Sequence, residues 1–303
     1  MAINKELWVA EVKDQLFEGA EWIRRSTNHD AYVNNAIVHV PNAGSLPAVQ
    51  VNPSVFPLTI SQRTDNDLTY SLKQIGTEPT LIQDWEAFQI SYDKQSSVLR
   101  QHAGIINDMV ALEAAYAWAV SGVTDAARII RTSGANGTTL APGATGTRKK
   151  LTYADITKAA ERLDRDKVGR TGRVLVLDTG MYWELFSDTN LIQSDVMGRV
   201  TLPEGVINRL AGFDIYLYNA PVVYNNASDP VKKAIGAATA STDNLAGLFF
   251  QADTVSNALG AINVYSDENK PEYYGSVFSA MVLHAAQVIR TDRAGVGAIV
   301  QTA

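Results

Sequence analysis

The clearest periodic pattern of the chain lies between residues 92 and 121. Mostly apolar positions recur there at spacings of four and three residues, at Val98, His102, Ile105, Met109, Leu112, Tyr116 and Ala119. This spacing places side chains on one face of an α-helix, and roughly 25 residues at ~1.5 Å each make a rod of about 38 Å. We therefore predict a long helix that buries this stripe, with His102 as a satisfied core or boundary histidine rather than a ligand.

A second helix is predicted from Thr152 to Asp166. Thr152 and Asp155 have the spacing of a capping pair, and the apolar face consists of Ile156, Ala160 and Leu163. Strand patterns follow at residues 173–178, 214–218, 248–251, 276–283, 286–290 and 296–300. Because these strands are not strictly interleaved with helices, the pattern predicts an α+β fold rather than a parallel α/β sheet.

Residues 36–90 have a different, extended character. The stretch IVHVPNAGSLPAVQVNPSVFP holds four prolines, which excludes a helix. Residues 58–62 and 68–74 alternate apolar and polar side chains around turn-forming residues 64–67, and this predicts a β-hairpin. Such a hairpin is marginal alone, so we expect it to lie on the body of its own chain or on an adjacent subunit.

The N-terminal residues 3–25 have a roughly helical but irregular apolar spacing that includes two tryptophans. We predict a short amphipathic arm whose tryptophans are buried. Packing within the same subunit and packing on a neighbour both remain open.

Composition and charge narrow the class of protein. The 303 residues, about two domains in length, are 46% hydrophobic and 19% charged, with no cysteine. No apolar run approaches the ~20 residues that span a bilayer, and the N-terminus lacks the apolar core of a signal peptide. The net charge of −6 disfavours a dedicated DNA-binding protein, which needs excess Lys and Arg, but it allows a container for DNA.

Candidate chemistry is sparse. The Gly-rich run of residues 133–147 continues as Arg148, Lys149 and Lys150, whereas a phosphate-binding loop requires Gly-Lys-Ser/Thr before a helix. Neither GxSxG nor HExxH occurs, and the four histidines are scattered. The acidic pairs Asp65/Asp67 and Asp267/Glu268 lie in predicted turns. We therefore expect no catalytic, metal or cofactor site and predict that the protein is not an enzyme.

Two segments together resemble a known family. The first is GRVLVLDTGMYWELFSDTNLIQSDVMGRVTLPEGVINRLAGFDIYLYNAP, in which a buried strand, a helix, a loop and an aromatic strand follow one another. The second begins GLFFQADTVSNALGAINVY and ends RTDRAGVGAIV. Their order is similar to that of the major capsid proteins of tailed bacteriophages, which have the Hong Kong 97-like fold. In that family, a strand containing two phenylalanines and a helix of small residues precede long strands.

The resemblance implies a division of the chain into five parts. Residues 1–39 correspond to an N-terminal arm and 40–85 to an extended β-hairpin loop. Residues 86–151 correspond to a peripheral domain with a long spine helix, 152–261 to an axial domain, and 262–303 to strands that return to the peripheral domain. The inter-subunit contact candidates that follow are Trp8, Trp22, Arg63, Tyr70, Lys73, Asp188, Asn190, Arg199 and Glu204. Some relatives cross-link a Lys of the loop to an Asn, and Lys73 is the only Lys here, without diagnostic surroundings.

The function implied is that of a coat protein. Pentamers and hexamers of this chain would assemble into an icosahedral shell around double-stranded DNA, as part of the virion, built in the cytoplasm of a bacterial host. The expected partners are further copies, a portal protein, a separate scaffold protein, DNA bound non-specifically, and decoration proteins as an open option; no membrane is involved. Two alternatives remain: the shell of an encapsulin-like nanocompartment, and an uncharacterised hydrolase.

Overall fold

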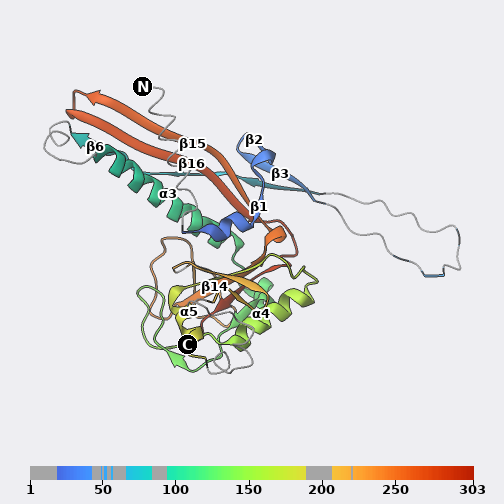
Figure 1. Ribbon diagram of the computed structural model, residues 1–303. Coiled ribbons are helices and arrows are strands. Elements are labelled where there is room, and N and C mark those ends of the chain that lie inside the picture. The colour runs from blue at the N-terminus through green and yellow to red at the C-terminus, as the bar shows by residue number, and fades with distance from the viewer. Residues whose placement is uncertain are drawn as a thin grey trace.

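The structure is a computed structural model that describes residues 19–42, 49, 51–52, 56, 66–83, 94–188, 207–219 and 221–303. Two β-sheets, each with helices packed against it, lie one above the other, and the C-terminus is in the lower one (Figure 1). Within these residues no helix is both long and apolar enough to cross a membrane.

The elements follow one another along the chain with short connections. The helical segments are η1 (Glu21–Arg25), η2 (Asp30–Tyr32), α3 (Lys94–Trp118), η3 (Val123–Arg128), α4 (Tyr153–Arg165), α5 (Thr179–Phe186) and η4 (Ala252–Thr254). The first strands are β1 (Thr27–Asn28), β2 (Val33–Asn34), β3 (Ile37–Asn42), β4 (Asn66–Ser71), β5 (Lys73–Gly76), β6 (Thr80–Gln83), β7 (Ile129–Arg131), β8 (Asn136–Gly137) and β9 (Arg148–Lys149). The later strands are β10 (Arg173–Leu177), β11 (Arg209–Leu210), β12 (Phe213–Leu217), β13 (Val222–Tyr224), β14 (Asn244–Gln251), β15 (Val255–Lys270), β16 (Gly275–Val288) and β17 (Val296–Val300).

The lower sheet, here called the body sheet, has the order β11-β12-β10-β14-β17-β7 in the described chain, with β13 also paired to β14. It is buried on both faces because β10 and β14 consist almost wholly of apolar residues. Val174 and Val176 of β10 face the core around the end of α3, whereas Leu175 and Leu177 face the core formed with α4 and α5. The period of two along a strand thus divides one sequence between two cores.

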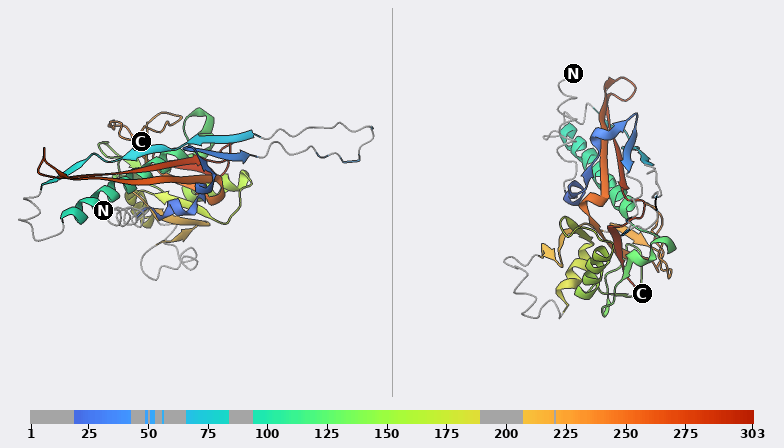
Figure 2. Two further views of the ribbon diagram at one scale, coloured as in Figure 1. Left: turned by 90° about the horizontal axis from the view of Figure 1, so that it is seen from above. Right: turned by 90° about the vertical axis from the view of Figure 1, so that its right-hand side faces the viewer.

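The upper sheet, here called the ribbon sheet, consists of β1, β15, β16 and β5, with β6 also paired to β16. β15 and β16 form a long antiparallel ribbon, and α3 lies along one face of it (Figures 1 and 2). A compact apolar cluster joins the two layers: Leu99, Ala103, Ile106 and Val110 of α3 with Val264, Ala280 and Val282 of the ribbon. This helix therefore packs on the ribbon at its start and on the body sheet at its end.

The long helix is confirmed, but its predicted buried stripe is wrong by one position. His102 is buried and its Nδ1 lies 2.6 Å from Thr77 Oγ1, as expected. Ile105 and Met109, however, are 62% and 39% exposed, while Ile106 and Val110 are fully covered. Two apolar stripes run side by side on α3, about 100° apart, and periodicity does not show which one the ribbon covers.

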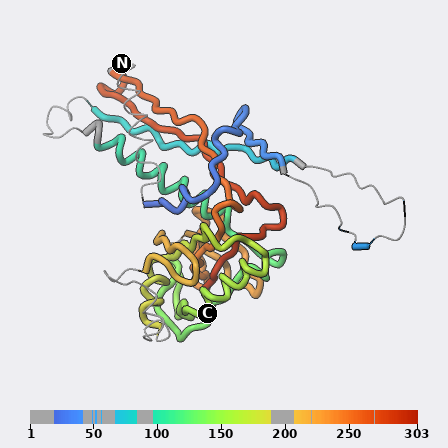
Figure 3. Tube along the Cα trace, turned by 45° about the vertical axis from the view of Figure 1, so that its right-hand side comes forward, coloured from blue at the N-terminus to red at the C-terminus, as the bar shows by residue number. Residues whose placement is uncertain are grey.

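The predicted hairpin exists with a different partner and turn. β4 pairs with β3 rather than with residues 58–62, which lie outside the described residues. Asp67, placed in the predicted turn, lies within β4 opposite Pro41. The two strands lead away from the rest of the molecule (Figure 3). The prolines excluded a helix, but Pro41 is compatible with an edge strand such as β3, because only one side of its backbone is needed for pairing.

The C-terminal part departs from the prediction in three ways. The expected small-residue helix after the two phenylalanines is absent from the described residues, which continue from η4 directly into β15, because cross-strand pairing with β16 overrides the helix preference of its alanines. Residues 276–290, predicted as two strands, contribute to the single strand β16. β17 pairs with β14 and β7 in the body sheet. The predicted return of residues 262–303 as one unit, and the assignment of residues up to 151 to the peripheral part, therefore do not match sheet membership.

Several local predictions are confirmed. α4 begins after Thr152, and the backbone amide and hydroxyl of Thr152 both donate to Asp155. β10, α5 and β12 follow in the order predicted for residues 172–221. The predicted arm of residues 3–25 lies outside the described residues up to residue 18, and its end is the short 3-10 helix η1 rather than an α-helix.

Candidate functional site

The histidines are held by single partners in separate places. Nδ1 of His29 lies 3.0 Å from the Tyr70 hydroxyl, and Nε2 of His284 lies 2.8 Å from Asn257 Oδ1. Burial lowers the pKa of His29 and His102 and lowers that of His284 to about 4. Among the described residues, no three His, Cys, Asp or Glu side chains lie close enough to hold a metal ion. These histidines serve as hydrogen-bonding groups of the fold.

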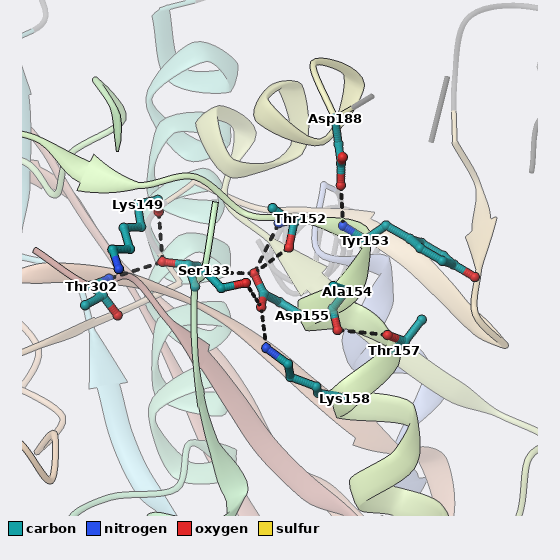
Figure 4. Close-up of polar contacts among 11 residues, drawn as sticks. Ser133, Lys149, Thr152, Tyr153, Ala154, Asp155, Thr157, Lys158, Asp188 and Thr302 are labelled. Carbon is teal, nitrogen blue, oxygen red and sulfur yellow. Dashed lines mark hydrogen bonds and ion pairs between the residues drawn. The ribbon is translucent and has the colours of Figure 1, made fainter. Parts of the chain in front are cut away.

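A dense polar cluster surrounds the start of α4 (Figure 4). The fully buried carboxylate of Asp155 accepts hydrogen bonds from the Ser133 hydroxyl at 2.7 Å, the Ser133 amide at 3.0 Å and Lys158 Nζ at 3.1 Å. It also accepts those from Thr152. Burial raises the pKa of Asp155, but these hydrogen bonds outweigh burial and the pKa ends below its usual value. The cluster fastens the Gly-rich run that begins at Ser133 onto α4, which explains that run without a phosphate ligand.

Replacing Asp155 by asparagine is expected to lower the free energy of unfolding at pH 7 by about 1–3 kcal/mol. A carboxylate whose pKa is lowered on folding contributes stability that is complete above its unfolded pKa of ~3.9 and is lost as the pH falls further. Asp155→Asn should therefore also flatten the loss of stability below about pH 4. Denaturant titrations of both chains from pH 3 to 7 measure this.

Glu161→Gln is the matched control, because Glu161 is an exposed carboxylate on the same helix, paired with Arg165. Such a surface pair contributes at most about 1 kcal/mol. An Asp155→Asn chain that follows the parent's stability curve at every pH would contradict the assigned role.

Three of the predicted contact residues are engaged within the subunit. The Tyr70 hydroxyl lies 3.1 Å from Ser256 Oγ, in addition to its contact with His29. Lys73 forms an ion pair with Glu113 of α3 at 2.6 Å. Asp188 accepts a hydrogen bond from the Tyr153 amide at the first turn of α4 (Figure 4). Lys73 and Asp188 keep exposed surface, so contact with a neighbour remains a prediction for them.

Trp22 is not a surface residue. Its ring is fully buried between Trp118, Tyr218 and Phe250, with ring centroids 5.4, 5.9 and 6.4 Å away. Packing within the same subunit therefore holds for this tryptophan, and its assignment as an inter-subunit contact is wrong. Trp8, Arg63, Asn190, Arg199 and Glu204 lie outside the described residues, and their roles stay predictions.

The sequence reasoning missed several exposed apolar side chains. Val49, Val51 and Phe56, between β3 and β4, are 88%, 83% and 72% exposed. Tyr273 and Tyr274, in the turn between β15 and β16, and Trp183 of α5 are also exposed. Large apolar groups in water are typical of surfaces that associate. The available signal was the aromatic pair beside the turn residues Asn269–Pro271, which turn chemistry alone did not explain.

The larger cavity lies where the ribbon sheet, α3 and the body meet. It has a volume of about 610 Å³, and its wall includes Lys73, Glu113, Tyr116, Lys232 and Arg293. A smaller cavity of about 180 Å³ lies between α3 and residues 221–239. Neither cavity combines a nucleophile with a base at hydrogen-bond distance, so the geometry found among the described residues is that of a structural junction.

Comparison of the sequence with models of protein families and with curated proteins finds no match. Solved structures do match. A chain of the capsid of cyanophage P-SCSP1u shares 20% identity at a TM-score of 0.61, over 91% of this chain and 85% of that one. A chain of the cyanophage Pam1 capsid asymmetric unit has a TM-score of 0.62 at 11% identity, covering 91% and 87%.

A third structure, the capsid of Ralstonia phage GP4, gives a TM-score of 0.61 at 11% identity, over 92% of this chain and 87% of the other. These alignments span both sheets and the elements between them. The described architecture, with a long helix on a β-ribbon, a projecting hairpin and a two-faced body sheet, accounts for the likeness. The chain thus has the fold of bacteriophage capsid proteins, the α+β Hong Kong 97-like fold.

Proposed function

We propose that this protein is the major capsid protein of a tailed bacteriophage and assembles as pentamers and hexamers into an icosahedral shell around double-stranded DNA. The observation that carries the proposal is a likeness to chains of phage capsids that extends over nine-tenths of this chain. The exposed apolar residues of the projecting hairpin and of the β15–β16 turn support it. A shell needs surfaces on each subunit that fit different surfaces on the next.

The proposed partners follow from this role. Copies of the chain make the wall, and a portal protein, a separate scaffold protein and decoration proteins join it in the virion after assembly in the host cytoplasm. The acidic net charge of −6 suits a wall that holds DNA non-specifically without strong attraction. No catalytic role is proposed.

Electron microscopy of the purified protein tests the function. We expect closed particles of uniform size under assembly conditions. A strictly monomeric protein, or a small closed dimer, would sink the proposal, and particles that hold a co-purified enzyme instead of DNA would favour the encapsulin-like alternative.

A variant of the segment between α5 and β11 sharpens this test. Asn190, Arg199 and Glu204 are proposed to meet neighbours around the capsomer axis, so replacing all three by alanine should reduce particle yield at unchanged unfolding energy. Glu161→Ala with Arg165→Ala, an exposed pair on α4, is the control that should leave yield unchanged. Normal particles from the triple variant would contradict the placement of these contacts while leaving the capsid function standing.

A further inference from the structure

The C-terminal end of α3 is closed by a lysine from the opposite part of the molecule. Lys232, in the connection between β13 and β14, donates from Nζ to the carbonyl oxygens of Tyr116 at 2.7 Å and Ala119 at 2.8 Å. The same amine lies 4.4 Å from the centre of the Tyr116 ring. A cation in this position satisfies carbonyls that a helix end leaves without partners and complements the helix dipole.

Further hydrogen bonds join the same two segments. The Tyr224 hydroxyl donates to the Val120 carbonyl at 2.6 Å, and the Gly122 amide donates to the Pro230 carbonyl at 2.8 Å. The Lys232 amide donates to Ser121 Oγ at 3.2 Å. Because α3 packs on the ribbon and β13 pairs within the body sheet, residues 116–122 and 224–232 form the joint between the two halves.

The joint borders the larger cavity, which gives its charged groups access to solvent. The groups facing Lys232 come from every neighbouring element. They are Lys73 of β5, Glu113 and Tyr116 of α3, Asp125 of η3, His284 of β16, and Arg290 and Arg293 after it. Asp125 is paired with Arg293 and accepts a hydrogen bond from the Ser121 amide. The amine of Lys232 therefore lies among cations that outnumber the nearby carboxylates.

We propose that Lys232 is a proton-sensitive latch between α3 and the body: its amine closes the joint from a desolvated position, and gain of a proton favours release of the 224–232 segment into solvent. The device needs no ligand. It is a property of one subunit and does not depend on assembly, so its failure would not bear on the capsid function.

The direction of the effect follows from the surroundings of the amine. Burial above all, and then Arg293 and Lys73, lower the pKa of Lys232 to about 8, while Asp125 acts in the opposite direction. A released, hydrated lysine has its ordinary pKa of ~10.4. The open joint thus binds the proton more tightly than the closed joint, so raising the pH from 8 towards 10 favours closure. His284, with its pKa lowered to about 4 by burial, stays neutral throughout this range.

Amide hydrogen exchange of the full-length chain tests the latch. The amides of Gly122 and Lys232 report opening because their hydrogen bonds cross the joint. After correction for intrinsic exchange rates, their opening constant is expected to fall about tenfold between pH 7.5 and 9.5, a factor reduced below the full pKa difference for partial solvation. The amide of Leu175, inside the body sheet, should not follow this change.

Lys232→Met retains the length of the apolar stem without the titrating amine, and Lys232→Arg retains a permanent cation. Both variants should lose the pH dependence of opening, and the second keeps the test valid if the first does not fold. An opening constant that rises with pH in the parent, or that keeps its pH dependence in Lys232→Arg, would overturn the proposal.

Discussion

Replacing Arg148 by methionine is expected to lower the free energy of unfolding by about 4 kcal/mol, a large part of the 5–15 kcal/mol typical of a folded protein. Arg148 is buried, and its guanidinium donates to Asn244 Oδ1 at 2.6 Å and to the carbonyls of Thr147 at 2.9 Å and Asp243 at 3.2 Å. It also reaches the carbonyls of Thr145 and Ser241. One planar group therefore joins the end of the Gly-rich run to the segment that precedes β14.

The loss is large because methionine fills similar space but leaves these buried acceptors without donors. The variant Arg148→Lys places all its donors on one nitrogen and cannot replace the planar fork, so it should recover only part of the stability. Arg165→Met, at an exposed position of α4, is the control and should change stability by less than about 0.5 kcal/mol. Denaturant titration measures all three; equal midpoints for Arg148→Met and the parent would disprove the assigned role.

Replacing Trp22 by alanine is expected to destabilise the isolated subunit by about 3–5 kcal/mol. Trp22 is among the largest fully buried side chains and ties η1 to Trp118 at the end of α3 and to Phe250 of the body sheet. Alanine would leave a cavity at the point where these three elements meet. Unfolding of the non-assembled protein, followed by tryptophan fluorescence or circular dichroism, gives the measurement.

Trp22→Phe separates packing from the indole group. It keeps an aromatic ring against Trp118 and removes an indole N–H that has no hydrogen-bond partner among the described residues, so the loss should be clearly smaller than for alanine. A chain with Trp22→Ala that unfolds like the parent yet fails to assemble would instead restore the inter-subunit role first predicted for this residue.

Elements whose pattern depends on near neighbours could be predicted from the sequence. The capping pair of Thr152 and Asp155 is confirmed because both groups act within one helical turn. The strand of residues 173–177 is confirmed because its unbroken apolar run is typical of a strand buried on both faces. The candidate site was less accessible: burial of Trp22 depends on Trp118 and Phe250, which are distant in the sequence.

The amino-acid sequence by itself determined the α+β class, the long helix, the order of strands and helices around residues 172–221, and the absence of cysteine chemistry. These follow from periodicity and composition, which are local properties. Only the tertiary structure decided that Ile106 rather than Ile105 of α3 is buried, that β4 pairs with β3, and that β17 belongs to the body sheet. The reason is that a helix with two apolar stripes, or a strand with two possible partners, satisfies its local preferences either way. Which surface is covered is then set by long-range packing.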